Sequence, residues 1–164
     1  MMIGQWSKNE ISICVMLIVI YVLPFFLPKR LSKHMTILSF IWGAAAGFLV
    51  EFTIGGGVID FYTVNDSNSY ELFDFFYYIM FAPFGYLFMN FYEVFSITKK
   101  TFAYYVTAWS FIGLFANWLF NKLDIIHFKN GYMLSYSFAV FLLIQTITGL
   151  YYQYLKQKEH SSEV

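Results

Sequence analysis

The chain has 164 residues, of which 59% are apolar and only 12% are charged, and its formal net charge at pH 7 is zero. Soluble domains have roughly 45–50% apolar and about 25% charged residues, so the few charged side chains of this chain would cover a soluble surface poorly. The zero net charge argues against a nucleic-acid-binding protein, and the single cysteine, Cys14, excludes an intrachain disulfide framework and a cysteine-based zinc site. The composition predicts a polytopic membrane protein.

Five segments are apolar enough for transmembrane helices, which need about 20 residues each. They are residues 11–27, 35–54, 72–92, 101–120 and 132–154. We expect the first segment to be retained rather than cleaved as a signal peptide, because no basic region precedes it and no small-residue cleavage site follows it. The sequence thus predicts a single all-α transmembrane domain over residues 1–164, a bundle of five membrane-spanning helices.

The basic residues predict the orientation of this bundle, because Lys and Arg concentrate in cytoplasmic segments. With the N-terminus outside, the inner segments contain Lys29, Arg30, Lys33, Lys99, Lys100, Lys156 and Lys158. The outer segments then contain only Lys8, Lys122 and Lys129. We therefore expect a multi-pass protein of the cell membrane with its N-terminus outside and its C-terminus in the cytoplasm. Residues 55–71 form its one long outer loop, rich in Gly, Asn, Ser and Asp.

Two features of the predicted helices bear on packing. Gly43 and Gly47 form a Gly-x-x-x-Gly pattern, which lets two backbones come close, either in a dimer or inside the five-helix bundle. Pro83 and Gly85 interrupt the third predicted helix near its middle, because proline removes a helix hydrogen bond and usually kinks the helix. Broken helices often line transporter sites, although kinked structural helices are also common.

Polar residues inside membrane segments are costly, so they are candidates for a ligand or ion site. Glu51 and Asn117 each lie 16 residues into helices that run in the same direction, so they share a depth near the outer surface. Asp74 starts the third helix close to that level, and Asp60 lies in the outer loop above it. Glu51, Asn117 and Asp74 could form a polar pocket in the outer half of the bundle, capped by the loop around Asp60, which is a further candidate ligand residue. Alternatively, Glu51 reaches the interface by itself, about 6 Å away by the helix rise.

Catalytic and cofactor signals are sparse. His34, His127 and His160 lie in different segments, so no metal or haem site is predicted, and no cofactor is expected. No Gly-x-Ser-x-Gly, His-Glu-x-x-His or phosphate-binding glycine loop occurs. An aspartyl pair drawn from Asp60, Asp66 and Asp74 is conceivable, because two close carboxylates can share a proton.

Several short motifs suggest a family. They are the proline-basic junction Leu27-Pro28-Lys29-Arg30-Leu31-Ser32-Lys33, the loop residues Asp60 and Tyr62, the central Pro83, and the pair Asn130-Gly131-Tyr132 and Ser135-Tyr136-Ser137. With these motifs the chain resembles an uncharacterised family of small multi-pass membrane proteins from endospore-forming firmicutes. The resemblance covers most of residues 24–155 and implies the topology and the source, without an activity.

Three functional hypotheses remain. The first is a non-catalytic component of a membrane or envelope assembly, for instance one related to sporulation, which associates through its helices with itself or with a membrane protein partner. The second is a small transporter or channel subunit with a polar site in the outer half of the bundle. The third is an intramembrane enzyme. The expected partners are the lipid bilayer and, through helix faces, a second copy of the chain or another membrane protein; no nucleic acid is expected.

Overall fold

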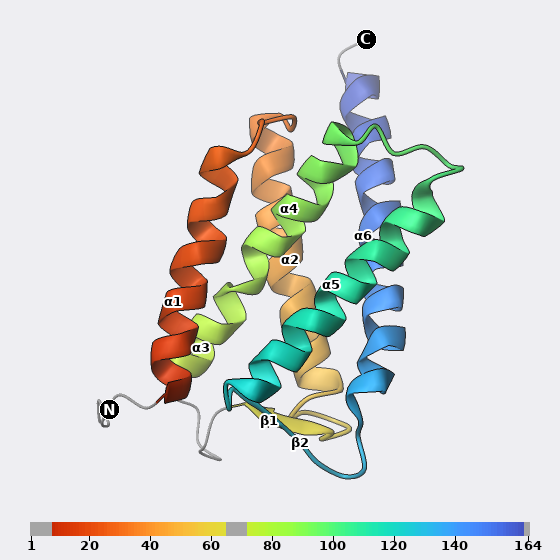
Figure 1. Ribbon diagram of the computed structural model, residues 1–164. Coiled ribbons are helices and arrows are strands. Elements are labelled where there is room, and N and C mark those ends of the chain that lie inside the picture. Colours follow the sequence, from red (N-terminus) through yellow and green to blue (C-terminus); the bar gives the residue numbers. More distant parts are fainter. Residues whose placement is uncertain (1–7, 65–71, 163–164) are drawn as a thin grey trace.

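The computed structural model describes residues 8–64 and 72–162. Its helices are α1 (Lys8–Val22), α2 (Lys33–Thr53), α3 (Leu72–Ile79), α4 (Phe81–Val94), α5 (Phe102–Lys122) and α6 (Leu134–Ser162). A 3-10 turn, η1 (Leu23–Phe26), follows α1, and strands β1 (Tyr62–Val64) and β2 (Ile126–Phe128) pair antiparallel. Figure 1 shows the long helices running alternately up and down, with the strands at one end of the bundle and the end of α6 at the other. We name these the sheet end and the C-terminal end.

The helical membrane class is confirmed in its general form. Three helical segments, Lys8–Phe26, Lys33–Thr53 and Leu134–Glu159, are long and apolar enough to cross a membrane. The helix α5 is 21 residues long, but its Tyr, Trp and Asn side chains lower its hydropathy. The predicted helix over residues 72–92 is divided between α3 and α4. The number of spans and the orientation stay predictions at this point.

The division between α3 and α4 follows from Pro83. A proline inside a helix has no N–H to bond the carbonyl four residues earlier, and its ring clashes with that carbonyl. That residue is Ile79, where α3 ends, so the break falls at Met80, three residues before Pro83. The hydroxyl of Tyr21 on α1 donates a hydrogen bond to the Ile79 carbonyl, at 2.9 Å. The carbonyl freed by Pro83 is thus satisfied by a neighbouring helix. Gly85, the other residue predicted to interrupt the helix, lies inside α4.

Two glycines bring α2 and α4 into close contact. A Cβ atom added to Gly43 would lie 2.6 Å from the carbonyl oxygens of Phe81 and Ala82, and one added to Gly85 would lie 2.7 Å from the Gly43 backbone. Gly47 faces the side chain of Phe81 in the same way. The Gly-x-x-x-Gly pattern of α2 therefore packs against α4 within the bundle.

The helices α5 and α6 form a second pair, in which the ring of Phe141 packs on Gly113. Polar contacts link the two pairs from the middle of the bundle to the C-terminal end. The indole N–H of Trp42 donates to Thr148 at 2.9 Å, and the Tyr105 hydroxyl donates to the Phe88 carbonyl. The carboxylate of Glu93 accepts hydrogen bonds from Tyr152 at 2.8 Å and Lys156 at 2.7 Å.

The strands β1 and β2 link the two pairs at the sheet end. Tyr62 pairs with Phe128, Thr63 with His127, and Val64 with Ile126. Because β1 follows α2 and β2 follows α5, the sheet joins two connections that are distant in sequence. Phe61 extends this contact, since its carbonyl accepts from the Lys129 N–H at 2.9 Å and its ring stacks on Tyr132. The loop predicted over residues 55–71 thus folds back onto the bundle where the structure describes it.

The close contact at Gly43 predicts whether an alanine at this position raises or lowers the free energy of unfolding. Gly43→Ala should lower the free energy of unfolding by about 1–3 kcal/mol, because the methyl group overlaps backbone atoms of α4. Without that contact, the same change would raise stability by up to about 1 kcal/mol through helix propensity. Thermal unfolding in detergent checks this prediction. Gly56→Ala is the control, since its Cβ would meet only one atom, at 3.9 Å. An unchanged or raised melting temperature for Gly43→Ala would contradict it.

The hydrogen bond between Tyr21 and Ile79 predicts that substitutions at Tyr21 and Pro83 have non-additive effects on stability. Tyr21→Phe should cost about 1 kcal/mol, the usual net value of one hydrogen bond. The same change should cost much less in a Pro83→Ala background, because an alanine at that position supplies the helical N–H for the Ile79 carbonyl. Tyr104→Phe, at a residue that is 79% exposed on α5, serves as the control. Equal costs in the two backgrounds would show that Pro83 does not create the need for Tyr21.

Candidate functional site

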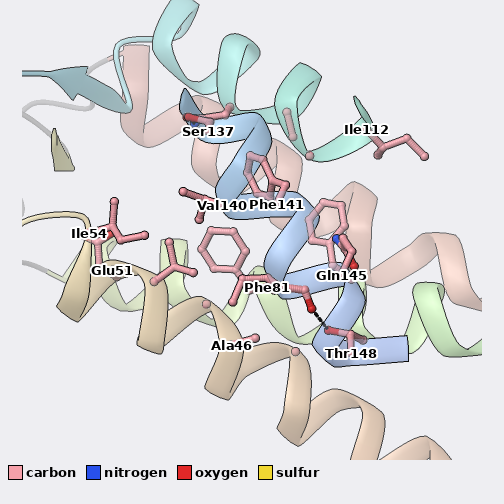
Figure 2. A pocket seen from close by; sticks show the side chains of 18 of the residues that line it. Ala46, Glu51, Ile54, Phe81, Ile112, Ser137, Val140, Phe141, Gln145 and Thr148 are labelled. Carbon is pink, nitrogen blue, oxygen red and sulfur yellow. Dashed lines mark hydrogen bonds between the residues drawn. The ribbon is translucent and has the colours of Figure 1, made fainter. Parts of the chain in front are cut away.

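A cavity of about 130 Å³ lies between the α2–α4 pair and the α5–α6 pair, in the space between the links at the two ends. Its wall is mostly aromatic and aliphatic. Figure 2 shows the side chains of Phe81 and Phe141 in the middle of this wall. Ile112 also lines the cavity and is 47% exposed, so the wall of the cavity reaches the outside of the bundle at this side chain.

Polar side chains lie toward both ends of the cavity. In Figure 2, Glu51 and Ser137 lie toward one end, and Gln145 and Thr148 lie toward the other. Thr148 already accepts the hydrogen bond from Trp42. The polar groups at the end near Glu51 are only partly satisfied, and this end is closed by residues of the strands and of the segment that leads into α6.

Glu51 lies in the last turn of α2, and its side chain is only 6% exposed. The carboxylate accepts hydrogen bonds from the Tyr62 hydroxyl and from the Gly56 backbone N–H. A side chain at position 55 would collide with this carboxylate, because a Cβ added to Gly55 would lie 2.8 Å from Glu51 Oε1. The second oxygen, Oε2, has no hydrogen-bond partner among the described residues. The carboxylate therefore faces the cavity rather than the bundle surface.

Asn117 lines the same cavity from α5 and is 8% exposed. Its Nδ2 group donates to the hydroxyl of Ser137 at 2.7 Å, and this hydroxyl also lies 3.0 Å from the hydroxyl of Tyr132. The Asn117 Oδ1 atom has no partner within residues 8–64 and 72–162. Glu51 and Asn117, which line the cavity from different helices, thus each have one buried acceptor oxygen without a partner among the described residues.

The other two candidate residues, Asp74 and the loop residue Asp60, do not line the cavity. Asp74 is buried on α3, and it lies near enough for its charge to act on Glu51, but it is not part of the cavity wall. Asp60 forms an ion pair with Lys129 at 2.6 Å, and its carbonyl accepts a hydrogen bond from Asn130. Asp60 therefore lies in the connection that closes the bundle at the sheet end, outside the cavity wall. Asp66 lies outside the described residues.

Tyr62 is a permanent hydrogen-bond donor in this site. Burial raises the pKa of the Tyr62 hydroxyl well above its usual range, and the neighbouring Glu51 raises it further. Both effects disfavour a phenolate, since burial and a nearby negative charge each oppose a second negative charge. Tyr62 thus keeps its proton and remains a donor to Glu51.

Sequence reasoning did not assign Tyr62, Tyr132 and Ser137 to the site. A signal for Ser137 was present: it lies three residues into α6, and Asn117 lies five residues before the end of the antiparallel α5. These positions have the same depth at the sheet end. No comparable signal exists for Tyr62, because its place depends on a strand pairing between connections that are far apart in the sequence.

At the C-terminal end, by contrast, the side-chain amide of the buried Asn90 has hydrogen-bond partners for both its nitrogen and its oxygen. Its Nδ2 group donates to the Pro28 carbonyl at 3.0 Å, and its Oδ1 atom accepts from the Arg30 N–H at 2.9 Å. Asn90 therefore fixes the connection between η1 and α2. This difference distinguishes a structural amide from that of Asn117, a cavity-lining residue whose buried oxygen has no partner among the described residues.

The chain matches no protein-family model, no curated protein and no solved structure. The resemblance to the membrane proteins of endospore-forming firmicutes therefore stays a prediction. What the protein does has to follow from its own residues.

Proposed function

We propose that this chain is an integral membrane protein of five transmembrane segments that binds a small molecule in its interhelical cavity, as a small transporter or ligand-binding subunit. The single observation that carries this proposal is the pair of unpaired, more than nine-tenths buried oxygens of Glu51 and Asn117 in one cavity. An unsatisfied buried acceptor costs about 1–3 kcal/mol, and more when it is charged. A bound molecule that donates hydrogen bonds would remove this cost.

The five-span topology is supported by the exposed apolar side chains. Phe111 on α5 is 57% exposed and Phe115 is 61% exposed, and on α1 Ile18 and Val19 are similarly exposed. Such side chains favour contact with lipid over contact with water. The basic connections at residues 28–33 and 99–100 also lie at the C-terminal end, together with the basic end of α6 (Figure 1). By the positive-inside rule, this end faces the cytoplasm in our proposal.

The assembly hypothesis remains an alternative. The exposed apolar side chains of α1 and α5 would suit a helix-mediated contact, but a bilayer alone also covers them. No contact in the described part of the chain favours a protein partner over lipid. The cavity therefore carries the proposed function, and the assembly role stays a prediction.

The proposed orientation can be measured by labelling single cysteines in intact cells. In a Cys14→Ser background, an impermeant thiol reagent should label a Val58→Cys variant and should leave a Ser161→Cys variant unlabelled. Val58 is 86% exposed at the sheet end, and Ser161 is exposed at the C-terminal end. Both variants should react after the cells are opened. Labelling of position 161 but not position 58 in intact cells would reverse the orientation.

Binding in the cavity can be tested with three probes that share one ring: benzylamine, benzyl alcohol and benzoate. At least one should change the fluorescence of the purified protein, because Trp42 and Trp109 line the cavity. Ala116→Phe fills part of the cavity and should weaken that binding at least tenfold. The control is Ala108→Phe, at an exposed position of the same helix. If no probe binds, or if both variants behave alike, the proposed function is wrong.

A further inference from the structure

We infer that the ligand is a protonated amine with an apolar body, whose N–H groups bind the free oxygens of Glu51 and Asn117. This inference rests on the proposed function, since it names the chemical class of the small molecule that the cavity takes. Three independent properties of the site lead to it: its hydrogen-bond inventory, its charge, and the size and nature of its wall.

The hydrogen-bond inventory leaves acceptors open. The Tyr62 hydroxyl donates to Glu51, and the Asn117 amide donates to Ser137. The open groups are Glu51 Oε2 and Asn117 Oδ1, which both accept. A ligand that satisfies both oxygens must supply at least two hydrogen-bond donors. An alkylammonium group has three donors and no acceptor, whereas an alcohol has one donor and a carboxylate has none.

The charge of the site favours a cation. Among the described residues, those that line the cavity include one carboxylate, Glu51, and no Lys, Arg or His. Asp74 is close enough to add a second negative influence on Glu51. A buried carboxylate is costly unless it is neutralised or paired with a positive charge. An ammonium group supplies that charge, and an anionic ligand would instead bring like charges together.

The wall of the cavity fits an apolar body next to the charge. Aromatic rings from five helices line it, among them Trp42 on α2, Tyr77 on α3, Phe81 on α4, Trp109 on α5 and Phe141 on α6. Aromatic faces also attract cations. A dry cavity of about 150 Å³ in another protein holds benzene. The cavity of about 130 Å³ therefore has nearly the volume that one aromatic ring needs.

An ammonium group could come from a free amine or from the headgroup of phosphatidylethanolamine. That headgroup carries a phosphate beside its ammonium. Within the part of the chain that the structure describes, no basic side chain lines the cavity to bind a phosphate. The site therefore favours a free amine, and the experiment below separates the two sources.

The experiment compares the affinities of benzylamine, benzyl alcohol and benzoate for the full-length protein at pH 7, in detergent, by tryptophan fluorescence. Benzylamine, which is protonated at this pH, should bind at least tenfold more tightly than either the neutral or the anionic probe. Glu51→Gln, which keeps the size of the side chain, should remove this preference. The matched control is Glu93→Gln, because Glu93 is a carboxylate at the C-terminal end that pairs with Lys156 and does not line the cavity.

The comparison of probes on the unaltered protein does not depend on any variant folding well. Benzyl alcohol or benzoate binding as tightly as benzylamine would overturn the amine inference and leave the proposed cavity intact. Failure of all three probes would overturn the proposed function itself. An equal loss of affinity in Glu51→Gln and Glu93→Gln would also overturn the inference. Competition by phosphatidylethanolamine in nanodiscs, but not by phosphatidylglycerol, would assign the same ammonium chemistry to a lipid headgroup.

Discussion

The backbone contact at Gly43 and Gly85 is the constraint on which the rest of the bundle depends. In a bilayer, apolar side chains gain little by leaving lipid for another helix, so association relies on close packing and on polar contacts. The two glycines provide that packing for α2 and α4. Because Glu51 lies two turns beyond Gly43 on α2, the same contact determines which way the carboxylate faces. A larger residue at either position would move Glu51 as well as the helices.

The cavity follows from how the two helix pairs are joined. Each pair packs closely along its own length, around Gly43 in one case and around Gly113 in the other. Between the pairs, the links at the two ends are those of Glu93 with Tyr152 and Lys156 at the C-terminal end, and the strands at the sheet end. In the middle of the bundle, aromatic side chains from both pairs line the cavity and do not fill it. A hollow between rigid pairs is therefore a property of the architecture rather than of one missing side chain.

The sequence predicted those features that depend on position along a helix. The helical class followed from composition, and the common depth of Glu51 and Asn117 followed from the rise per residue, since both line one cavity. Depth alone does not fix the direction in which a side chain points around its helix, so a Glu51 that reaches the interface remained an equal alternative. The structure decides the direction, because the carboxylate is buried and bonded to Tyr62.

Features that depend on contacts between distant segments were not predictable. The strands β1 and β2 are three residues each, too short for a clear alternating pattern, and they lie more than sixty residues apart in the chain. The ion pair between Asp60 and Lys129 depends on that pairing, so the sequence could place Asp60 in the loop above the helices but could not give it this partner. The break at Met80 was displaced from Pro83 because a proline acts on the turn that precedes it.

Tyr62 gives the strand pairing a role in the chemistry of the cavity. Side chains alternate across a strand, and in β1 Tyr62 and Val64 are buried whereas Thr63 is only partly buried. A register shift of one residue would turn Tyr62 to the opposite face and take its hydroxyl away from Glu51. The hydrogen bonding of the buried Glu51 carboxylate thus depends partly on backbone hydrogen bonds outside the cavity, and loop substitutions that alter the register would change it without any substitution in helices α2 to α6.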